Sequence, residues 1–544
     1  VGVVAPRSAT EEVVAAVFAD VLGVEGVGAL DDFFELGGHS LLATQAVSRM
    51  RDVFEVEIPL RTMFENPTVE GIAQVVDGGG RAAHRTPMAR VDSTVGAPLS
   101  LQQMGLWHSA YQLSESFASY NIPIELWLHG DLDVEALERS LVDLVGAHDI
   151  LRTTFPERDG APVQIVGPHV DFTLPTTRTT RAEVAGIARE QALQPFSLKT
   201  ERPWRSRLLI LEDGDQVLLI TLHHILTDGW SMDELTRQLG ARYALHTGSA
   251  GTGADGPAPQ EGAVGIGSPD ALPVQYADYA AWQHEWLHGE EARQQAEYWA
   301  QQLHEIRPLW DRRIDPAHAE LYRGVRHRFS IPAETAHALR LFAKSNNATL
   351  YMAMLTGFML LLSEMSDKDD IAVGTPVAGR TRSELNELIG YFAHIVLLRT
   401  DLSGTPAFTD ALQRVRETVI SAFANQEVSI SSVARELESK RYRGRVSLFQ
   451  AHFSLTHESV RSSSFGDLDL RFEFTRVPNP FANIDLELEV FERGESLDAW
   501  LIYNEGMFDP GEIAGLTEQL LALYERMAAQ APIQQHIEQS RKRI

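Results

Sequence analysis

The chain has 544 residues, no cysteine and a formal charge of −28 at pH 7, from 47 Lys and Arg against 75 Asp and Glu. The negative charge disfavours nucleic acid and anionic membranes as partners, and the missing cysteines exclude disulfides, thiol nucleophiles and thiolate metal sites. No apolar run approaches the ~20 residues that span a bilayer, and the N-terminus lacks the pattern of a secretion signal. We therefore expect a globular protein in the cytoplasm, possessing no metal site.

The first 77 residues have the pattern of a small helical domain. Apolar residues recur at helical spacing over 11–22 and 40–53, and a short last helix is expected over 69–76 after the break at Asn66-Pro67-Thr68. This pattern predicts an all-α bundle of three or four short helices over residues 1–77. Residues 78–97 are rich in Gly, Ala and Pro and are predicted to be a linker.

The remaining residues mix helix and strand patterns without a regular βαβ repeat, which favours an α+β fold. The clearest strand is predicted at Gln216–Leu222 (QVLLITL), which is almost wholly apolar. Further strands are expected over 370–373 and 393–399, and helices over 132–147, 180–192, 405–425 and 509–529. Because this body is large for one core, we expect two lobes, 98–270 and 271–544. The low-complexity stretch 247–272 is predicted to be a mobile surface segment between them.

A first candidate site lies in the small domain, in the sequence FFELGGHSLL. Gly37 and Gly38 permit a tight turn, and Ser40 stands where the apolar periodicity of the next helix begins. A hydroxyl there lies beside unpaired backbone N–H groups, which also favour a phosphate attached to it. The alternative interpretation is that Ser40 is only the N-cap of the helix.

This stretch resembles the phosphopantetheine attachment motif of the peptidyl carrier proteins of non-ribosomal peptide synthetases. The resemblance implies a four-helix carrier bundle in which Ser40 holds a covalent 4′-phosphopantetheine arm. The arm would end in a thiol that carries an aminoacyl or peptidyl thioester. The partners implied are a phosphopantetheinyl transferase and an adenylation domain that loads the arm.

A second candidate site directly follows the strand predicted at 216–222, in the sequence HHILTDGWS. His223 and His224 are adjacent on an extended chain, so their side chains are expected to point in opposite directions. A shared metal ion is disfavoured because adjacent histidines do not converge on one ion. A buried structural histidine and an acid–base histidine acting on an amine remain as alternatives.

The pattern His-His-x-x-x-Asp-Gly is similar to that of the condensation domains and related chloramphenicol-acetyltransferase-like acyltransferases. Six further stretches resemble family motifs in the family order: residues 100–107, 148–155, 276–282, 389–392, 425–428 and 445–450. The resemblance implies a two-lobed α+β fold like that of chloramphenicol acetyltransferase, with a substrate tunnel between the lobes.

The resemblance also implies roles for individual residues. His224 would stand at the acceptor amine, either as a general base or as the group that positions it, whereas His223 would be structural and point inward. Asp228 would form a buried salt bridge, for which Arg380 is the expected partner. Gly229 would let the chain turn, and its N–H would assist an oxyanion. Simple turn chemistry is the alternative for Asp228 and Gly229.

Four residues are predicted to line the substrate tunnel: Ser100, Gly105, Trp107 and Arg380. Gly105 departs from the family pattern, which usually has Arg at this position, and the smaller residue predicts a wider opening on the acceptor side. Ala147, where Arg is common, and His394, where Asn is usual, are further departures.

We therefore expect peptide-bond formation, in which an amine on a downstream acceptor carrier attacks a thioester held at Ser40. Because the carrier precedes the condensation domain, it is expected to be the donor carrier. Two alternatives remain. A carrier–epimerisation pair would remove an α-proton, and a non-catalytic platform would only dock other proteins. A cyclisation domain is disfavoured because it would replace the double histidine with an Asp-rich motif.

Overall fold

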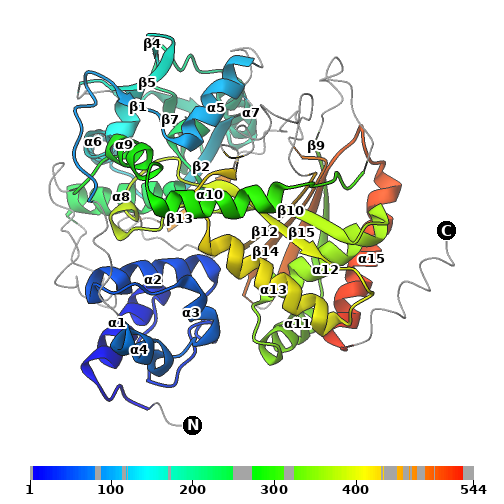
Figure 1. Cartoon of the computed structure of the whole chain (residues 1–544). Helices are drawn as coiled ribbons and strands as arrows, with labels where there is room; N and C mark the ends of the chain where they lie inside the picture. Colours follow the sequence, from blue (N-terminus) through cyan, green and yellow to red (C-terminus); the bar gives the residue numbers. More distant parts are fainter. Residues whose placement is uncertain are drawn as a thin grey trace.

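Figure 1 shows the chain as a computed structural model. The structure describes residues 4–79, 87–112, 118, 120–168, 173–248, 272–310, 324–430, 433, 450–457, 465, 469–474, 484–494 and 496–530. The predicted surface segment 247–272 lies almost wholly outside these residues, as does most of the motif at 445–450.

The N-terminal domain is a four-helix bundle, as predicted. Its helices are α1 (Ala9–Leu22), α2 (Ser40–Phe54), α3 (Leu60–Glu65) and α4 (Val69–Gly78). Phe18 and Phe33 are fully buried and meet edge to face at 4.9 Å between ring centroids. Ser8 caps α1 and Thr68 caps α4, each by accepting a backbone N–H in the first turn. These buried aromatic rings and capped helix ends hold the bundle together.

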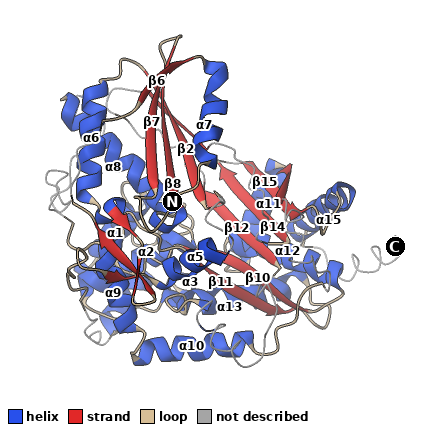
Figure 2. Ribbon diagram, turned by 90° about the horizontal axis from the view of Figure 1, so that it is seen from above, coloured by secondary structure: helices blue, strands red, loops and turns tan. Residues whose placement is uncertain are grey.

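The first lobe of the large domain is built on a five-stranded sheet in the order β13-β2-β8-β7-β6. These strands are β2 (Asn121–His129), β6 (Thr176–Thr179), β7 (Trp204–Leu211), β8 (Gln216–His223) and β13 (Asp469–Phe474). Helices α6 (Val134–Ala147) and α8 (Gly229–Thr247) cover one face and α7 (Val184–Leu193) covers the other (Figure 2). Because both faces are covered, β8 is buried along nearly its whole length.

The second lobe carries a six-stranded sheet in the order β11-β10-β12-β14-β15-β9. Its strands are β9 (Gly324–Ile331), β10 (Asp370–Val377), β11 (His394–Asp401), β12 (Ala451–His457), β14 (Leu486–Arg493) and β15 (Ser496–Asn504). The helices that pack against it are α11 (Ala333–Ser345), α12 (Leu350–Ser366), α13 (Phe408–Ala424) and α15 (Pro510–Ala528). Helix α12 is almost entirely buried and is the centre of this core.

The two lobes are not simply successive in the chain. Strand β13, from the C-terminal half, pairs antiparallel with β2 in the first sheet, with Phe474 opposite Ile124. Leu385 and Phe392 are buried in the core of the first lobe, although they also belong to the C-terminal half. The predicted boundary between residues 270 and 271 stays a prediction. In the structure, segments from the C-terminal side of that boundary pack into the first lobe.

Four short strands form a third, small sheet, in which β5 (Ala161–Val166) pairs with β1 (Ala97–Pro98), β3 (Thr153–Thr154) and β4 (Glu157–Arg158). The remaining helices of the large domain are α5 (Leu101–Gln112), α9 (Tyr276–Trp286) and α10 (Glu290–Leu303). Part of the predicted linker is fixed to the large domain, because Met88 is buried in its core and the Val91 N–H donates to Asp278. No single helix in the described residues is long and apolar enough to cross a membrane, although the bent pair α11–α12 passes by length and composition.

Candidate active site at a strand-to-helix turn

His224 lies where β8 ends and a short 3-10 turn begins, and its side chain is half-buried. Its Nδ1 lies 2.7 Å from the backbone carbonyl of Thr227. A carbonyl only accepts hydrogen bonds, so Nδ1 carries the proton in the neutral ring and Nε2 presents its lone pair. No acceptor or donor for Nε2 is found among the described residues. The ring is therefore oriented as a base or as an acceptor for an amine N–H.

His223 points into the core, and its Nδ1 is a hydrogen-bond acceptor, unlike that of His224. It is 4% exposed, and its Nδ1 accepts the backbone N–H of Ile225 at 3.1 Å. Burial, aided by the neighbouring His224, lowers the pKa of His223 to about 3. His223 is thus a neutral interior residue that holds the turn, and the two adjacent histidines do separate work.

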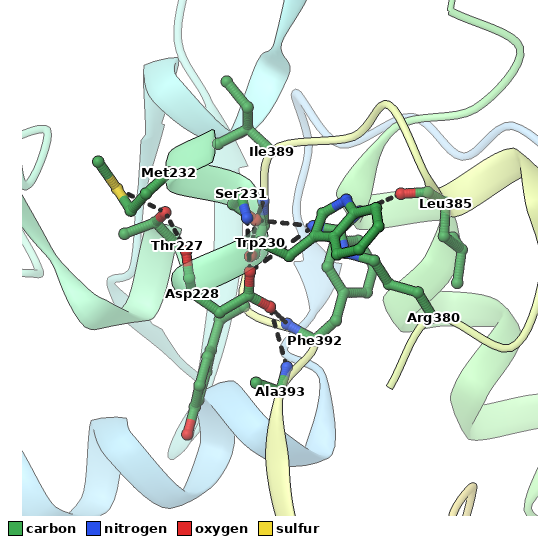
Figure 3. A network of polar contacts seen from close by, with 12 residues as sticks. Thr227, Asp228, Trp230, Ser231, Met232, Arg380, Leu385, Ile389, Phe392 and Ala393 are labelled. Atoms are coloured by element: carbon green, nitrogen blue, oxygen red, sulfur yellow. Dashed lines mark hydrogen bonds and ion pairs between the residues drawn. The ribbon is translucent and has the colours of Figure 1, made fainter. Parts of the chain in front are cut away.

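Asp228 is the centre of a buried polar network (Figure 3). Its Oδ1 accepts the Ser231 N–H at 2.8 Å, which makes it the N-cap of α8. Its Oδ2 accepts the N–H groups of Phe392 and Ala393 at 2.9 and 3.0 Å. One carboxylate therefore begins a helix of the first lobe and also holds a loop from the C-terminal half.

Arg380 lies beside Asp228, as expected, with 3.7 Å between Nη2 and Oδ1. Both side chains are 1% exposed, and Arg380 Nη2 donates to Ser231 Oγ at 2.7 Å. The guanidinium also stacks over the Phe392 ring at 4.2 Å and donates to the Leu385 carbonyl. Burial lowers the pKa of Arg380, while the Asp228 carboxylate opposes that shift. Arg380 and Asp228 together hold the loop between β10 and β11 through contacts in the protein interior.

Gly229 is the first residue of α8 and is exposed. It does not have a positive φ, and an added Cβ would meet nothing within 4 Å. The turn itself therefore does not require glycine here, contrary to the predicted reason. The missing side chain instead leaves free space directly after Asp228.

Three residues predicted to line the tunnel are interior residues in the structure. Ser100 is fully buried and caps α5, with its Oγ accepting the Gln103 N–H at 3.1 Å. Trp107 is 7% exposed, and its indole N–H donates to the Phe155 carbonyl at 3.1 Å. Arg380 is buried in the network described above. Each of the three is buried with partners inside the protein, and their place in the lining of a tunnel stays a prediction.

Gly105 is different, because it is exposed in the middle of α5. An added Cβ there would meet nothing within 4 Å. This agrees with the expectation of an open surface at Gly105. The two other departures from the family pattern, Ala147 and His394, are both buried, and His394 Nε2 lies 2.5 Å from the Gln426 carbonyl.

Sequence reasoning gave no role to two residues that contact His224. The Thr227 carbonyl orients the ring, but a backbone acceptor leaves no signal in residue type. The Tyr391 ring meets the imidazole at 4.6 Å between centroids. Tyr391 stands in the stretch 389–392, so the motif match gave a signal without a role.

In the small domain, Ser40 is the first residue of α2, and His39 is its N-cap. The N-cap position of this helix thus falls on His39, and the role of the Ser40 hydroxyl stays a prediction. Gly37 has a φ of 100°, and a Cβ on Gly38 would lie 2.3 Å from the Phe33 ring, so both positions need glycine. The glycine turn places position 40 at the N-terminus of the helix, which is the positive end of its dipole. This environment favours a phosphate ester at position 40.

The carrier bundle contacts the second lobe through α2 and α3 (Figure 1). Buried apolar residues of the bundle and of this lobe form one connected cluster. The polar contacts are Ser48 Oγ to the Thr381 carbonyl at 3.0 Å, Lys344 to Glu35 at 2.6 Å, Arg61 to Glu417 at 3.0 Å, Arg416 to the Phe64 carbonyl at 3.2 Å, and Ser383 to Asp52. Thr381 and Ser383 belong to the same loop that Asp228 holds at its other end.

Comparison with known proteins gives the family of each domain. Residues 96–539 match the model of the condensation domain, and residues 12–76 match that of the phosphopantetheine attachment site. One of the subunits that make up linear gramicidin synthase of Brevibacillus parabrevis is 39% identical over 95% of this chain and 7% of the relative. Surfactin synthase subunit 1 of Bacillus subtilis is 34% identical over 93% of this chain and 14% of the relative. The chain thus spans only a small part of the curated relatives that it matches.

Solved structures resemble the large domain. The X-domain from teicoplanin biosynthesis has a TM-score of 0.70 and 26% identity, covering 82% of this chain and 98% of that one. The X-domain in complex with OxyB has a TM-score of 0.71 and 26% identity, and the match covers 83% of this chain and 98% of that one. The first condensation domain of the calcium-dependent antibiotic synthetase, with a substrate analogue, gives 0.63 and 19%, covering 81% and 99%, and supports the fold alone.

Proposed function

This chain belongs to the condensation-domain family and joins a phosphopantetheine carrier domain to a condensation domain of a non-ribosomal peptide synthetase, and from that premise we propose that it forms a peptide bond. Phosphopantetheine bound at Ser40 would supply the thiol that holds the acyl group as a thioester, which is a good acyl donor. An amine delivered by a separate acceptor carrier would attack the acyl carbon, so that a C–N bond forms as the C–S bond breaks. The proton that the amine loses would pass to the departing sulfur, which leaves as a free thiol.

The orientation of His224 carries this proposal. Its Nδ1–H is directed to the Thr227 carbonyl, so the Nε2 lone pair is left for the amine. A lone pair fixed in this way serves a general base and an amine-positioning group equally well. General-base catalysis of this kind contributes roughly 10²–10⁴-fold, and holding the two partners together supplies much of the remaining rate.

Asp228 and Gly229 act on the same turn. Asp228 fixes the start of α8 and the loop at 392–393, so it sets where His224 stands without touching substrate. Gly229 leaves space after Asp228, and its backbone N–H at the first position of α8 is suited to stabilise an oxyanion.

The contacts between the bundle and the second lobe support a donor role for this carrier. The bundle rests on the loop that also carries Tyr391, the residue in contact with His224. The proposed partners are an acceptor carrier, an adenylation domain that loads Ser40, and a phosphopantetheinyl transferase. The proposal includes a cytoplasmic location, because a chain without cysteine needs no oxidising compartment.

The test is dipeptide formation by the full chain, loaded at Ser40, with an acceptor thioester mimic. We expect His224→Ala to lower the rate by about 10²-fold or more. His246→Ala, on the last turn of α8, is the control, and it should match the parent. Equal product from the His224→Ala variant and the parent would contradict the proposal.

A second candidate is a docking platform, because the chain resembles an X-domain solved in complex with OxyB. The same assay separates the two, since a platform makes no dipeptide in either form. Epimerisation is tested on the loaded carrier alone by exchange of the α-proton with solvent. We expect no exchange that depends on His224.

A further inference from the structure

Tyr391 is the aromatic neighbour of the candidate catalytic ring. Its ring and the imidazole of His224 are 4.6 Å apart between centroids, with an angle of 60° between their planes. This is an edge-to-face contact, which restricts how far either ring can rotate. Tyr391 itself is half-buried.

The backbone around Tyr391 is held on both sides. Its own carbonyl accepts the Tyr276 hydroxyl, and the next N–H, that of Phe392, donates to Asp228 Oδ2 at 2.9 Å. On the other side, a Cβ on Gly390 would lie 2.0 Å from the Tyr276 ring. The loop backbone is therefore tightly packed, and it holds the Tyr391 ring in place.

The imidazole needs such a neighbour because its hydrogen bond to the chain involves only one nitrogen. The bond from Nδ1 to the Thr227 carbonyl fixes one edge of the ring but allows the ring to tilt about that bond. A tilt moves Nε2 away from the position where an amine must meet it. A small misplacement of a reacting group is enough to lower a rate by up to ~10²-fold.

We infer that Tyr391 is a positioning residue, whose ring holds the His224 imidazole in the orientation that presents Nε2 to the acceptor amine. This inference rests on the proposed function. The contact between the two rings is what acts, because it is the interaction that the structure shows between these side chains. Burial raises the pKa of Tyr391, so the ring stays neutral at working pH.

The experiment compares Tyr391→Phe and Tyr391→Leu in the full chain, using the dipeptide assay. Tyr391→Phe keeps the ring and should stay within about 2-fold of the parent, whereas Tyr391→Leu should lower kcat about 10-fold or more. The KM for the acceptor mimic should be unchanged in both variants. Tyr298→Leu is the matched control, because Tyr298 is also half-buried and meets Trp299 edge to face at 4.8 Å.

A second measurement does not depend on turnover. In protein labelled with ¹⁵N-histidine, the His224 signals are identified by their loss in His224→Ala. The parent and Tyr391→Phe should show sharp His224 ring signals with the proton on Nδ1, whereas Tyr391→Leu should keep that tautomer but show ring signals broadened by motion. A parent-like kcat in Tyr391→Leu, or ring signals as sharp as those of the parent, would overturn the inference. If the parent makes no dipeptide while Tyr391→Leu still shows the broadening, the proposed function is contradicted and the positioning effect stands.

Discussion

Two adjacent histidines differ at the scale of a single proton. His224 has its proton on Nδ1, because a carbonyl faces that nitrogen, whereas His223 accepts an N–H at its own Nδ1 and must have the proton on Nε2. The alternation of an extended chain predicted that the two would point in opposite directions. It did not predict the tautomers, since these depend on Thr227 and Ile225 in the turn that follows.

Gly105 gives a residue-scale prediction about the acceptor side. We expect Gly105→Arg to raise the KM for a small acceptor thioester about 5-fold, close to 1 kcal/mol, because bulk and charge fill an open position. Gly105→Ala is the control. It should leave KM unchanged and stabilise α5 by about 0.5–1 kcal/mol, since glycine weakens a helix interior. An unchanged KM in Gly105→Arg would contradict the wider opening.

His148 predicts a dependence of stability on pH. It is fully buried, with Nε2 donating to Gln238 and Nδ1 facing the Ile389 N–H, and burial lowers its pKa to about 4. Because the unfolded ring titrates near 6.5, this contribution is complete above that pH and is lost as pH falls toward 4. Between pH 7 and 5 the loss should be about 2 kcal/mol.

Urea unfolding at the two pH values measures this loss. The variant His148→Gln should be less stable than the parent at pH 7 but should lose less on acidification. Identical pH dependence in the parent and the variant would show that some other group is responsible.

At the scale of elements, sequence patterns located most of the regular structure. The predicted helix over 69–76 is α4, and the strand over 216–222 is β8, because local periodicity and turn residues determine where such elements begin and end. The pairing of strands that are distant in the sequence could not be predicted from local sequence patterns. No pattern in β13 indicates that it joins β2, more than 300 residues earlier in the sequence.

The candidate site shows the same limit. Asp228 and Arg380 could be placed together because a family resemblance supplied the pairing. The burial of Ser100 and Trp107 was not predicted, because a motif at the start of a helix does not tell which side chains face the interior. Tyr391 had no predicted role, since its contact with His224 depends on how a distant loop packs.

Asp228 gives a prediction at the scale of elements, because it joins α8 to the loop at 392–393. We expect Asp228→Asn to destabilise the protein by about 3–5 kcal/mol, since the amide would turn a donor toward other N–H groups and leave Arg380 without its counter-charge. Asp133→Asn is the control, because Asp133 caps α6 at an exposed position and asparagine caps equally well. Equal thermal unfolding midpoints for the two variants would contradict the joining role.

At the scale of the whole molecule, the carrier contacts the second lobe through apolar packing and a few exposed ion pairs. Lys344 and Glu35 form an ion pair at 2.6 Å with both side chains more than half exposed. We expect Lys344→Glu and Glu35→Lys each to slow transfer from the loaded carrier about 2- to 5-fold, because each replaces an attraction between exposed charges with a repulsion. The double variant should recover the parent rate.

Arg293→Glu, in an exposed ion pair on α10, is the control for the change of charge and should have no effect. The measurement is the single-turnover rate from loaded Ser40. A double variant as slow as either single one would mean that this pair does not form during transfer.

The crossing of β13 into the first sheet has a consequence for anyone who recombines synthetases. A hybrid that takes residues up to 270 from one parent and the rest from another would join a foreign strand to β2, edge to edge. An exchange point at residue 270 separates the two halves in sequence, but it would combine strands from two parents in one hydrogen-bonded sheet. Exchanging the whole condensation domain together, or carrying β13 along with the first lobe, keeps native strands as neighbours.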